Sequence, residues 1–217
     1  MKACYVDSSV ILSALVTTDA RYLSSTEALK RLREQGWKLV TSTYAFAEAA
    51  NNAYRRVVEG RWVLAEPLEK LVKRVKALGP RALCEALTRA LLSLLEGWLR
   101  VEVVEDPELY TIESVNGMSM ARLFREAARL AWINCRTKDL LHIAAASLMR
   151  KRGVKRILTA DVENFERVKD ALEKELDLEV HIVYPPRSAP NPHAGIGARA
   201  GSTRVVEEYG EWRLRSP

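Results

Sequence analysis

Long apolar runs are missing from this sequence, although 48% of its 217 residues are hydrophobic. No run approaches the ~20 residues that a membrane-spanning helix needs, which argues against an integral membrane protein. The first residues reach the acidic Asp7 too soon to form a secretory signal peptide. We therefore expect a cytoplasmic protein that has no membrane partner.

Cysteine is also scarce. Cys4, Cys84 and Cys135 are far apart, and each lies in an apolar stretch. This pattern argues against a disulfide framework and against a cysteine-based metal site. It predicts three reduced, buried thiols.

A strong charge of either sign is absent, since the formal net charge is +6. A modest positive excess suits a polyanionic partner, and it is equally typical of a surface that only keeps a protein soluble. The charge becomes more informative beside the acidic residues described below, because a nuclease needs acids that hold metals and bases that hold phosphates.

Short apolar segments alternate with amphipathic ones along most of the chain. Strands are expected over residues 3–6, 38–41, 101–104, 154–159 and 178–184. Helices are expected over residues 10–16, 24–35, 43–58, 62–78, 81–99, 119–135, 138–152 and 162–176. This alternation predicts an α/β fold with a central parallel sheet and helices on both faces.

The composition changes near the C-terminus, where residues 185–217 hold five of the eight prolines. We expect one domain over residues 1–184 and a Pro/Gly/Arg-rich tail over 185–217. Within this tail, residues 203–206 could still pair as an edge strand.

Four acidic residues stand where a site would form in such a sheet. Asp7 directly follows the first strand, and Asp161 follows the strand 154–159 after one residue. Ligands of open parallel sheets bind beyond the carboxyl ends of the strands. These two acids therefore lie on the same edge of the sheet, called the rim below, if their strands are neighbours. Glu48 and Asp139 lie in apolar helical stretches, where a buried charge requires a partner or a metal.

Each of these residues has a simpler explanation when taken alone. The three aspartates could cap helices, and Glu48 could pair with Arg55 or Arg56. His142 is interpreted as a core histidine bonded to backbone, not as a ligand.

The four acids carry more weight together, because converging carboxylates repel one another unless cations bind them. Oxygen ligands select Mg²⁺ or Mn²⁺ over zinc. Two such cations would support phosphodiester hydrolysis.

Four segments resemble the motifs of PIN-domain ribonucleases and occur in the order typical of that family. They are Tyr5–Leu12 (YVDSSVIL), Phe46–Glu48 (FAE), Asp139–Ala146 (DLLHIAAA) and Thr159–Phe165 (TADVENF). The resemblance covers about residues 3–183, and its last two motifs are the specific ones.

The resemblance implies a three-layer α/β/α PIN-like fold and a Mg²⁺- or Mn²⁺-dependent endoribonuclease. It implies that the catalytic and metal-binding residues are Asp7, Glu48, Asp139 and Asp161, with Asn164 supporting the metal. Many compact members are VapC-type toxins that a small antitoxin protein inhibits, which makes an antitoxin a candidate partner besides RNA.

The sequence departs from compact members in its tail and in an inserted helical segment over about residues 60–115. An apolar face in this segment, formed by Leu68, Leu71, Val72 and Val75, must be buried on its own domain or on a second copy. We expect a homodimer that uses this segment.

Arg55 and Arg56 are the first candidates for binding RNA. Arg122, Arg125 and Arg129 share one helix face, and either set could be an ordinary solvated surface. Trp98 and Trp132 are expected in the core.

Three functions remain open at this point: the toxin of a toxin–antitoxin pair, an RNA-processing nuclease outside such a pair, and a non-catalytic PIN-like module that binds RNA or serves as a scaffold. A HAD-type phosphatase is disfavoured, because it needs a second aspartate at the position that Ser9 occupies.

Overall fold

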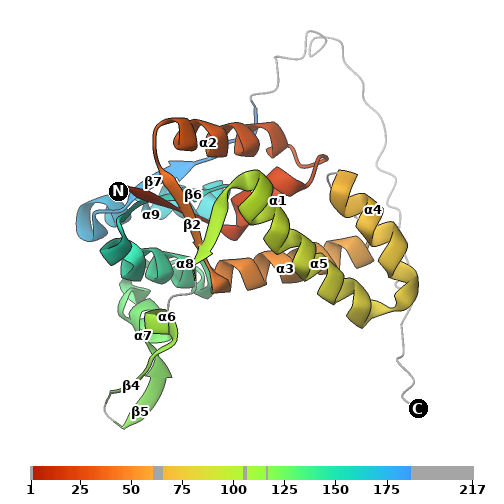
Figure 1. The fold of residues 1–217 in the computed structure, drawn as a ribbon. Coiled ribbons are helices and arrows are strands. Elements are labelled where there is room, and N and C mark those ends of the chain that lie inside the picture. The colour runs from red at the N-terminus through yellow and green to blue at the C-terminus, as the bar shows by residue number, and fades with distance from the viewer. Residues whose placement is uncertain (1, 61–65, 105–106, 116, 187–217) are drawn as a thin grey trace, which may run out of the picture. The chain divides into compact units, whose positions relative to one another are not determined.

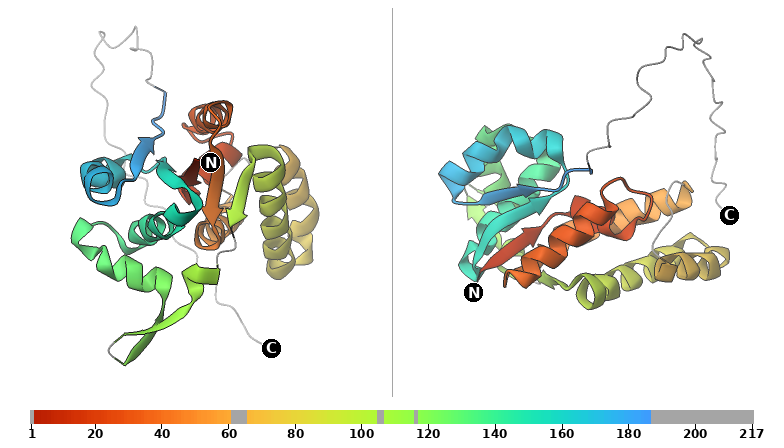
Figure 2. Two further views of the ribbon diagram at one scale, coloured as in Figure 1. Left: turned by 60° about the vertical axis from the view of Figure 1, so that its left-hand side comes forward. Right: turned by 90° about the horizontal axis from the view of Figure 1, so that it is seen from above.

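A computed structural model describes residues 2–60, 66–104, 107–115 and 117–186. The expectations for the tail, including the edge strand over 203–206, lie outside the described residues. Figures 1 and 2 show the fold.

The centre of the fold is a five-stranded parallel sheet with the order β3-β2-β1-β6-β7. The strands are β1 (Ala3–Val6), β2 (Lys38–Ser42), β3 (Val101–Val104), β6 (Val154–Thr159) and β7 (Glu179–Ile182). All four residues of the central strand β1 are buried, as expected for a parallel strand that is covered on both faces. The sequence-based prediction of an α/β fold with a parallel sheet is therefore confirmed.

Helices connect the strands and flank the sheet. The described helices are α1 (Ser8–Leu15), α2 (Tyr22–Glu34), α3 (Thr43–Val58), α4 (Glu66–Val75), α5 (Pro80–Leu94), α6 (Pro107–Tyr110), α7 (Arg122–Arg129), α8 (Thr137–Leu148) and α9 (Val162–Leu176). Helix α3 begins where the side chain of Ser42 accepts a hydrogen bond from the backbone of Ala45. Before β6, Gly153 takes a positive φ of 87°, which a glycine adopts without strain.

Two hydrophobic cores lie on the two faces of the sheet. Alternate residues of β1 divide between them, with Tyr5 in one core and Cys4 in the other. The first core is filled by α7, α8 and α9, and the second by α1, α2, α3 and α5. The sheet is therefore covered by helices on both faces.

The segment over residues 60–115 is joined closely to the rest of the domain. Helix α4 packs against α5, and α5 packs against α3. Figure 2 shows α4 and α5 lying side by side. Leu68 is buried in the second core and Val72 packs against it, so the apolar face of α4 is at least partly covered by its own chain. The segment also supplies the edge strand β3, and the homodimer stays a prediction.

The prediction of one helix over residues 119–135 is wrong at its start. An antiparallel hairpin of β4 (Ile112–Val115) and β5 (Met118–Ala121) precedes the shorter helix α7, and Figure 1 shows it extending from the body. The sequence carried a hairpin signal in Asn116-Gly117, since Asn-Gly favours a tight turn between strands.

Several burial predictions are also wrong. Trp98 and Trp132 are 44% and 55% exposed instead of lying in the core. The three cysteines are free, but only Cys4 is buried, whereas Cys84 is exposed and Cys135 is intermediate. A helix tolerates an apolar residue on its solvent face, and periodicity alone does not reveal that face.

None of the described helices is long and apolar enough to span a membrane.

Candidate functional site

The carboxyl ends of β1 and β6 place two of the predicted acids on one rim of the sheet. The two strands are parallel neighbours, and Asp7 and Asp161 follow them. Thr159 links the acids: its hydroxyl donates to Asp7 Oδ2 at 2.7 Å and accepts the backbone N–H of Asp161 at 3.1 Å. The rim expected from the sequence is therefore present.

Glu48 reaches the same rim from α3. The hydroxyl of Ser8 lies 2.6 Å from Glu48 Oε2 and 3.2 Å from Asp7 Oδ1, so it bridges the two acids. The alternative pairing of Glu48 with Arg55 is absent from the described residues. Arg55 lies instead 4.0 Å from Glu59.

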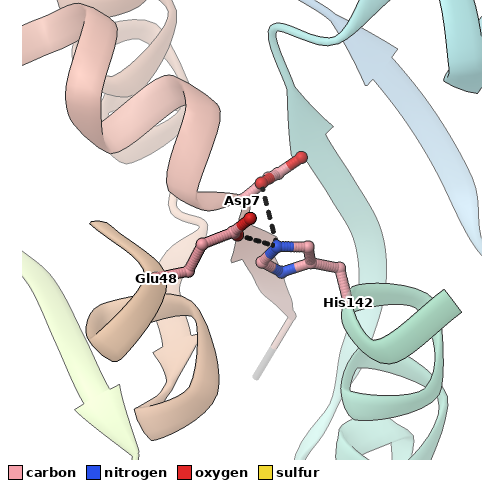
Figure 3. A group of neighbouring side chains, drawn as sticks. All are labelled: Asp7, Glu48 and His142. Atoms are coloured by element: carbon pink, nitrogen blue, oxygen red, sulfur yellow. Dashed lines mark hydrogen bonds and ion pairs between the residues drawn. The ribbon is translucent and has the colours of Figure 1, made fainter. Parts of the chain in front are cut away.

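His142 on α8 completes this cluster (Figure 3). Its Nε2 lies 2.7 Å from Glu48 Oε2 and 3.4 Å from Asp7 Oδ1. Its Nδ1 lies 3.0 Å from Tyr5 Oη, which in turn lies 2.9 Å from Ser42 Oγ. His142 is buried, as a core histidine would be, but the interpretation that it is bonded to backbone is wrong, because both of its ring nitrogens meet side chains of the site.

A signal for His142 existed in the sequence. It follows Asp139 by three residues in a helix, and residues at this spacing share a face. An acid that points toward the rim therefore brings His142 to the same side of α8.

Asp139 lies at the first turn of α8 and is 3% exposed. Its Oδ2 has no hydrogen-bond partner among the described residues. Arg136 Nε and Lys138 Nζ approach its two oxygens at 4.0 and 3.9 Å, distances beyond a hydrogen bond. Asp139 is thus a buried carboxylate that two cations face without bonding.

Asp161 and Asn164 form the outer part of the rim. Asp161 caps α9 by accepting the backbone N–H of Asn164 at 3.3 Å, and it also accepts the side-chain amide of Asn164 at 2.7 Å. The amide oxygen of Asn164 accepts from Arg136 Nε at 3.2 Å. Asn164 therefore connects Asp161 to Arg136.

Burial and charge shift the proton affinities of the site in opposite directions. Burial raises the pKa of Asp139 to about 6, and the charges of Asp161 and Asp7 add to the rise. Burial alone would also raise the pKa of Glu48, but hydrogen bonds from His142 and Ser8 lower it to about 2. Repulsion between crowded acids raises their pKa values, and Glu48 departs from this because a histidine lies against it.

The pKa of His142 responds to the same neighbours. Burial alone would lower it, but the charges of Asp7 and Glu48 raise the pKa above its ordinary value. The two carboxylates thus stabilise positive charge at this point, which is a position that also suits a metal cation.

Asp7, Glu48 and His142 are the residues best placed to hold a metal ion. One oxygen from each acid and one ring nitrogen of His142 all lie within 4.8 Å of one another. Asp139 and Asp161 stand beside this group but are not members of it. Four acids would have given a ligand set of oxygens alone. The three residues that lie closest together instead offer two oxygens and one nitrogen.

The basic residues considered for RNA binding lie on helices α3 and α7. Arg55 and Arg56 are exposed near the end of α3. Arg122 and Arg125 approach Glu113, and Arg129 pairs with Glu126. These three arginines therefore have acidic partners on the surface of the protein.

A hollow of about 510 Å³ lies elsewhere, between α2 and β7, with Arg31, Arg156 and His181 in its lining. The acids do not line this hollow. The cluster is thus a polar rim and differs from the apolar pockets that small organic ligands prefer.

Comparison with known proteins adds no family. No protein-family model matches the sequence, and no curated protein matches it.

Proposed function

We propose that the protein is a metal-dependent endoribonuclease whose catalytic centre is this rim. The observation that carries the proposal is the group of Asp7, Glu48 and His142, with ligand atoms within 4.8 Å, at the carboxyl edge of a parallel sheet. The resemblance of four segments to PIN-domain motifs supports RNA as the substrate. The α/β architecture with helices on both faces fits a PIN-like fold.

Mn²⁺ is the proposed cofactor, in preference to Mg²⁺. Mg²⁺ requires oxygen ligands in near-ideal octahedral geometry, whereas transition metals accept imidazole nitrogen. When bound, the cation would lower the pKa of a water molecule and stabilise the oxygen that leaves the phosphate. Asp7, Glu48 and His142 would hold it.

The surrounding residues hold these three side chains in place. Asp7 Oδ1 accepts the backbone N–H of Ser9 at 3.1 Å, while Oδ2 accepts the hydroxyl of Thr159. Tyr5 fixes the far side of the His142 ring. Contacts of this kind orient ligands and reduce the rearrangement that metal binding requires.

Asp139 is the proposed proton carrier. In the absence of a metal, burial brings the pKa of this carboxyl to about 6, close to the range in which a carboxyl exchanges a proton near neutral pH. Burial acts on both acids, but hydrogen bonds from His142 and Ser8 lower the pKa of Glu48, whereas Asp139 Oδ2 has no hydrogen-bond partner among the described residues. Asp161 and Asn164 complete the rim in a supporting role.

The test is cleavage of a 3′-labelled single-stranded RNA by the full chain with Mn²⁺, with Mg²⁺ and with EDTA. Metal-dependent cleavage that leaves a 5′-phosphate is expected, with Mn²⁺ the more effective ion. Asp7→Asn should abolish it, while Asp170→Asn, an exposed acid on α9, should not. Cleavage that survives EDTA would overturn the proposal. Metal binding without cleavage of any RNA would favour a non-catalytic module.

The physiological role and the partners are separate proposals. An antitoxin, a second copy of the chain, and RNA contacts by Arg55 and Arg56 all remain predictions. A toxin and an RNA-processing enzyme would share the rim described here and differ in their RNA targets.

A further inference from the structure

Two cationic side chains, those of Arg136 and Lys138, lie beside the acidic residues of the candidate site. Arg136 immediately precedes α8 and Lys138 is the second residue of that helix. Their side chains are 54% and 48% exposed, so a large ligand can reach both. They approach the same buried carboxylate, Asp139, from its two sides.

Neither Arg136 nor Lys138 makes a hydrogen bond to Asp139. The separations of 4.0 and 3.9 Å exceed a hydrogen bond, and Asp139 Oδ2 is left without a hydrogen-bond partner in the described part of the chain. Arg136 Nε–H donates to Asn164 Oδ1, which holds the guanidinium at the rim. Its Nη2 lies 3.9 Å from Glu163, an acid whose side chain is almost fully exposed.

The charge of Lys138 affects the pKa values of more than one acid of the site. It lowers the pKa of Glu48 as well as that of Asp139. Lys138 therefore lies close enough to influence acids from two different helices, α3 and α8. A ligand bound by both cations would lie next to the proposed metal ligands.

We propose that Arg136 and Lys138 bind the phosphate of a single-stranded RNA and position it at the metal centre. This inference rests on the proposed nuclease function. A guanidinium offers two parallel N–H groups to phosphate oxygens, and an ammonium adds a point charge. Asn164 acts as a positioning residue for Arg136.

A contact with phosphate carries no information about the base sequence. The two cations should therefore bind RNA of any sequence, and binding should weaken with added salt. For single strands, each phosphate contact contributes a slope of about −0.7 in log K against log of salt concentration.

The experiment measures binding separately from cleavage. Fluorescence anisotropy of a labelled 12-nucleotide oligo(U), and of an oligo(A) of equal length, is recorded with the full chain in EDTA at several KCl concentrations. Arg136→Gln and Lys138→Gln should each weaken binding about 3- to 10-fold for both RNAs and flatten the salt slope by about 0.7. The exposed Lys138 makes the second variant a safe one for the fold.

Arg150→Gln is the matched control. Arg150 follows α8 at its other end and lies 3.3 Å from Asp177, so its substitution removes one charge from the same region of the chain. Binding and salt slope in this variant should equal those of the wild type. If Arg136→Gln and Lys138→Gln behave like Arg150→Gln, the proposal is wrong.

Mn²⁺ affinity distinguishes phosphate binding from a merely structural role. Removing a positive charge beside the acids should leave Mn²⁺ binding unchanged or tighter. Loss of Mn²⁺ binding in both variants, together with RNA binding, would mean that the two cations only hold the acids in place, and would overturn the proposal. Wild-type protein that binds RNA through these residues but cleaves none would refute the nuclease function alone.

Discussion

Replacing Asp7 with asparagine removes one charge from the centre of the rim and changes little else. Asp7 is buried and caps α1 through the N–H of Ser9. Asparagine caps helices as well as aspartate does, and its amide can donate to the Thr159 hydroxyl oxygen. The fold should therefore survive, while the carboxylate that faces His142 at 3.4 Å is lost.

The expected effect is on the stabilisation that Mn²⁺ provides. A ligand at 100 times its dissociation constant stabilises the native state by about 2.7 kcal/mol. For a domain of this size, that corresponds to an increase in Tm of about 5–10 °C. If the loss of one charged ligand weakens Mn²⁺ binding about 100-fold, the same concentration stabilises by only about 0.4 kcal/mol, a shift of about 1–2 °C.

The assay is thermal unfolding of chelator-treated protein, followed by circular dichroism during a MnCl₂ titration. Asp170→Asn makes the same chemical change at an exposed position of α9, and it should retain the full shift. An equal shift in Asp7→Asn and in the wild type would mean that the cation binds elsewhere, and the site proposed here would be wrong.

Two further predictions concern the other shifted groups. The metal-free protein should lose up to about 3 kcal/mol of stability as the pH rises from about 4 to about 6, because a folded-state pKa of about 6 for Asp139 means that the folded state holds more protons in this range. Urea unfolding of Asp139→Asn should show a flatter profile, and an unchanged profile would contradict the raised pKa. His142→Gln should destabilise the metal-free protein at pH 6 by about 3 kcal/mol, since the buried Asp7 and the partly buried Glu48 lose their neighbour, and should weaken Mn²⁺ more than Mg²⁺ in calorimetric titrations. His181→Gln on the edge strand β7 is its control, and equal behaviour of the two variants would remove His142 from the site.

The parts of the site that depend on strand ends could be predicted from the sequence. A short apolar run followed by an acid indicates a buried strand whose carboxyl end carries that acid, as with β1 and Asp7. Parallel strands end at the same edge, so two such patterns place two acids together if the strands are neighbours. The pairing of β1 with β6 was required for this, and the structure contains it.

The contribution of α8 was harder to predict. Its residues from Asp139 to Ala146 are all buried, so periodicity does not indicate which side faces the rim. The role of His142 depends on the tertiary position of Tyr5 and Glu48, which are distant in sequence. For the same reason, the exposure of Trp98 and Trp132 was missed: it is decided by the packing of neighbouring elements.

Capping a helix and binding a metal are compatible roles for one carboxylate. An aspartate that caps a helix can therefore still be a metal ligand. A carboxylate has two oxygens with about four acceptor sites, whereas a helix cap uses one of them. Asp7 and Asp161 both cap helices, as the simpler explanation held, and both still lie at the rim.

The balance of hydrogen-bond donors and acceptors in the buried site is more informative than capping. Asp139 is not a cap, and one of its buried oxygens has no hydrogen-bond donor among the described residues. A buried acceptor without a donor is costly in a protein that binds nothing there, so Asp139 favours a ligand-binding rim over a set of independent helix caps.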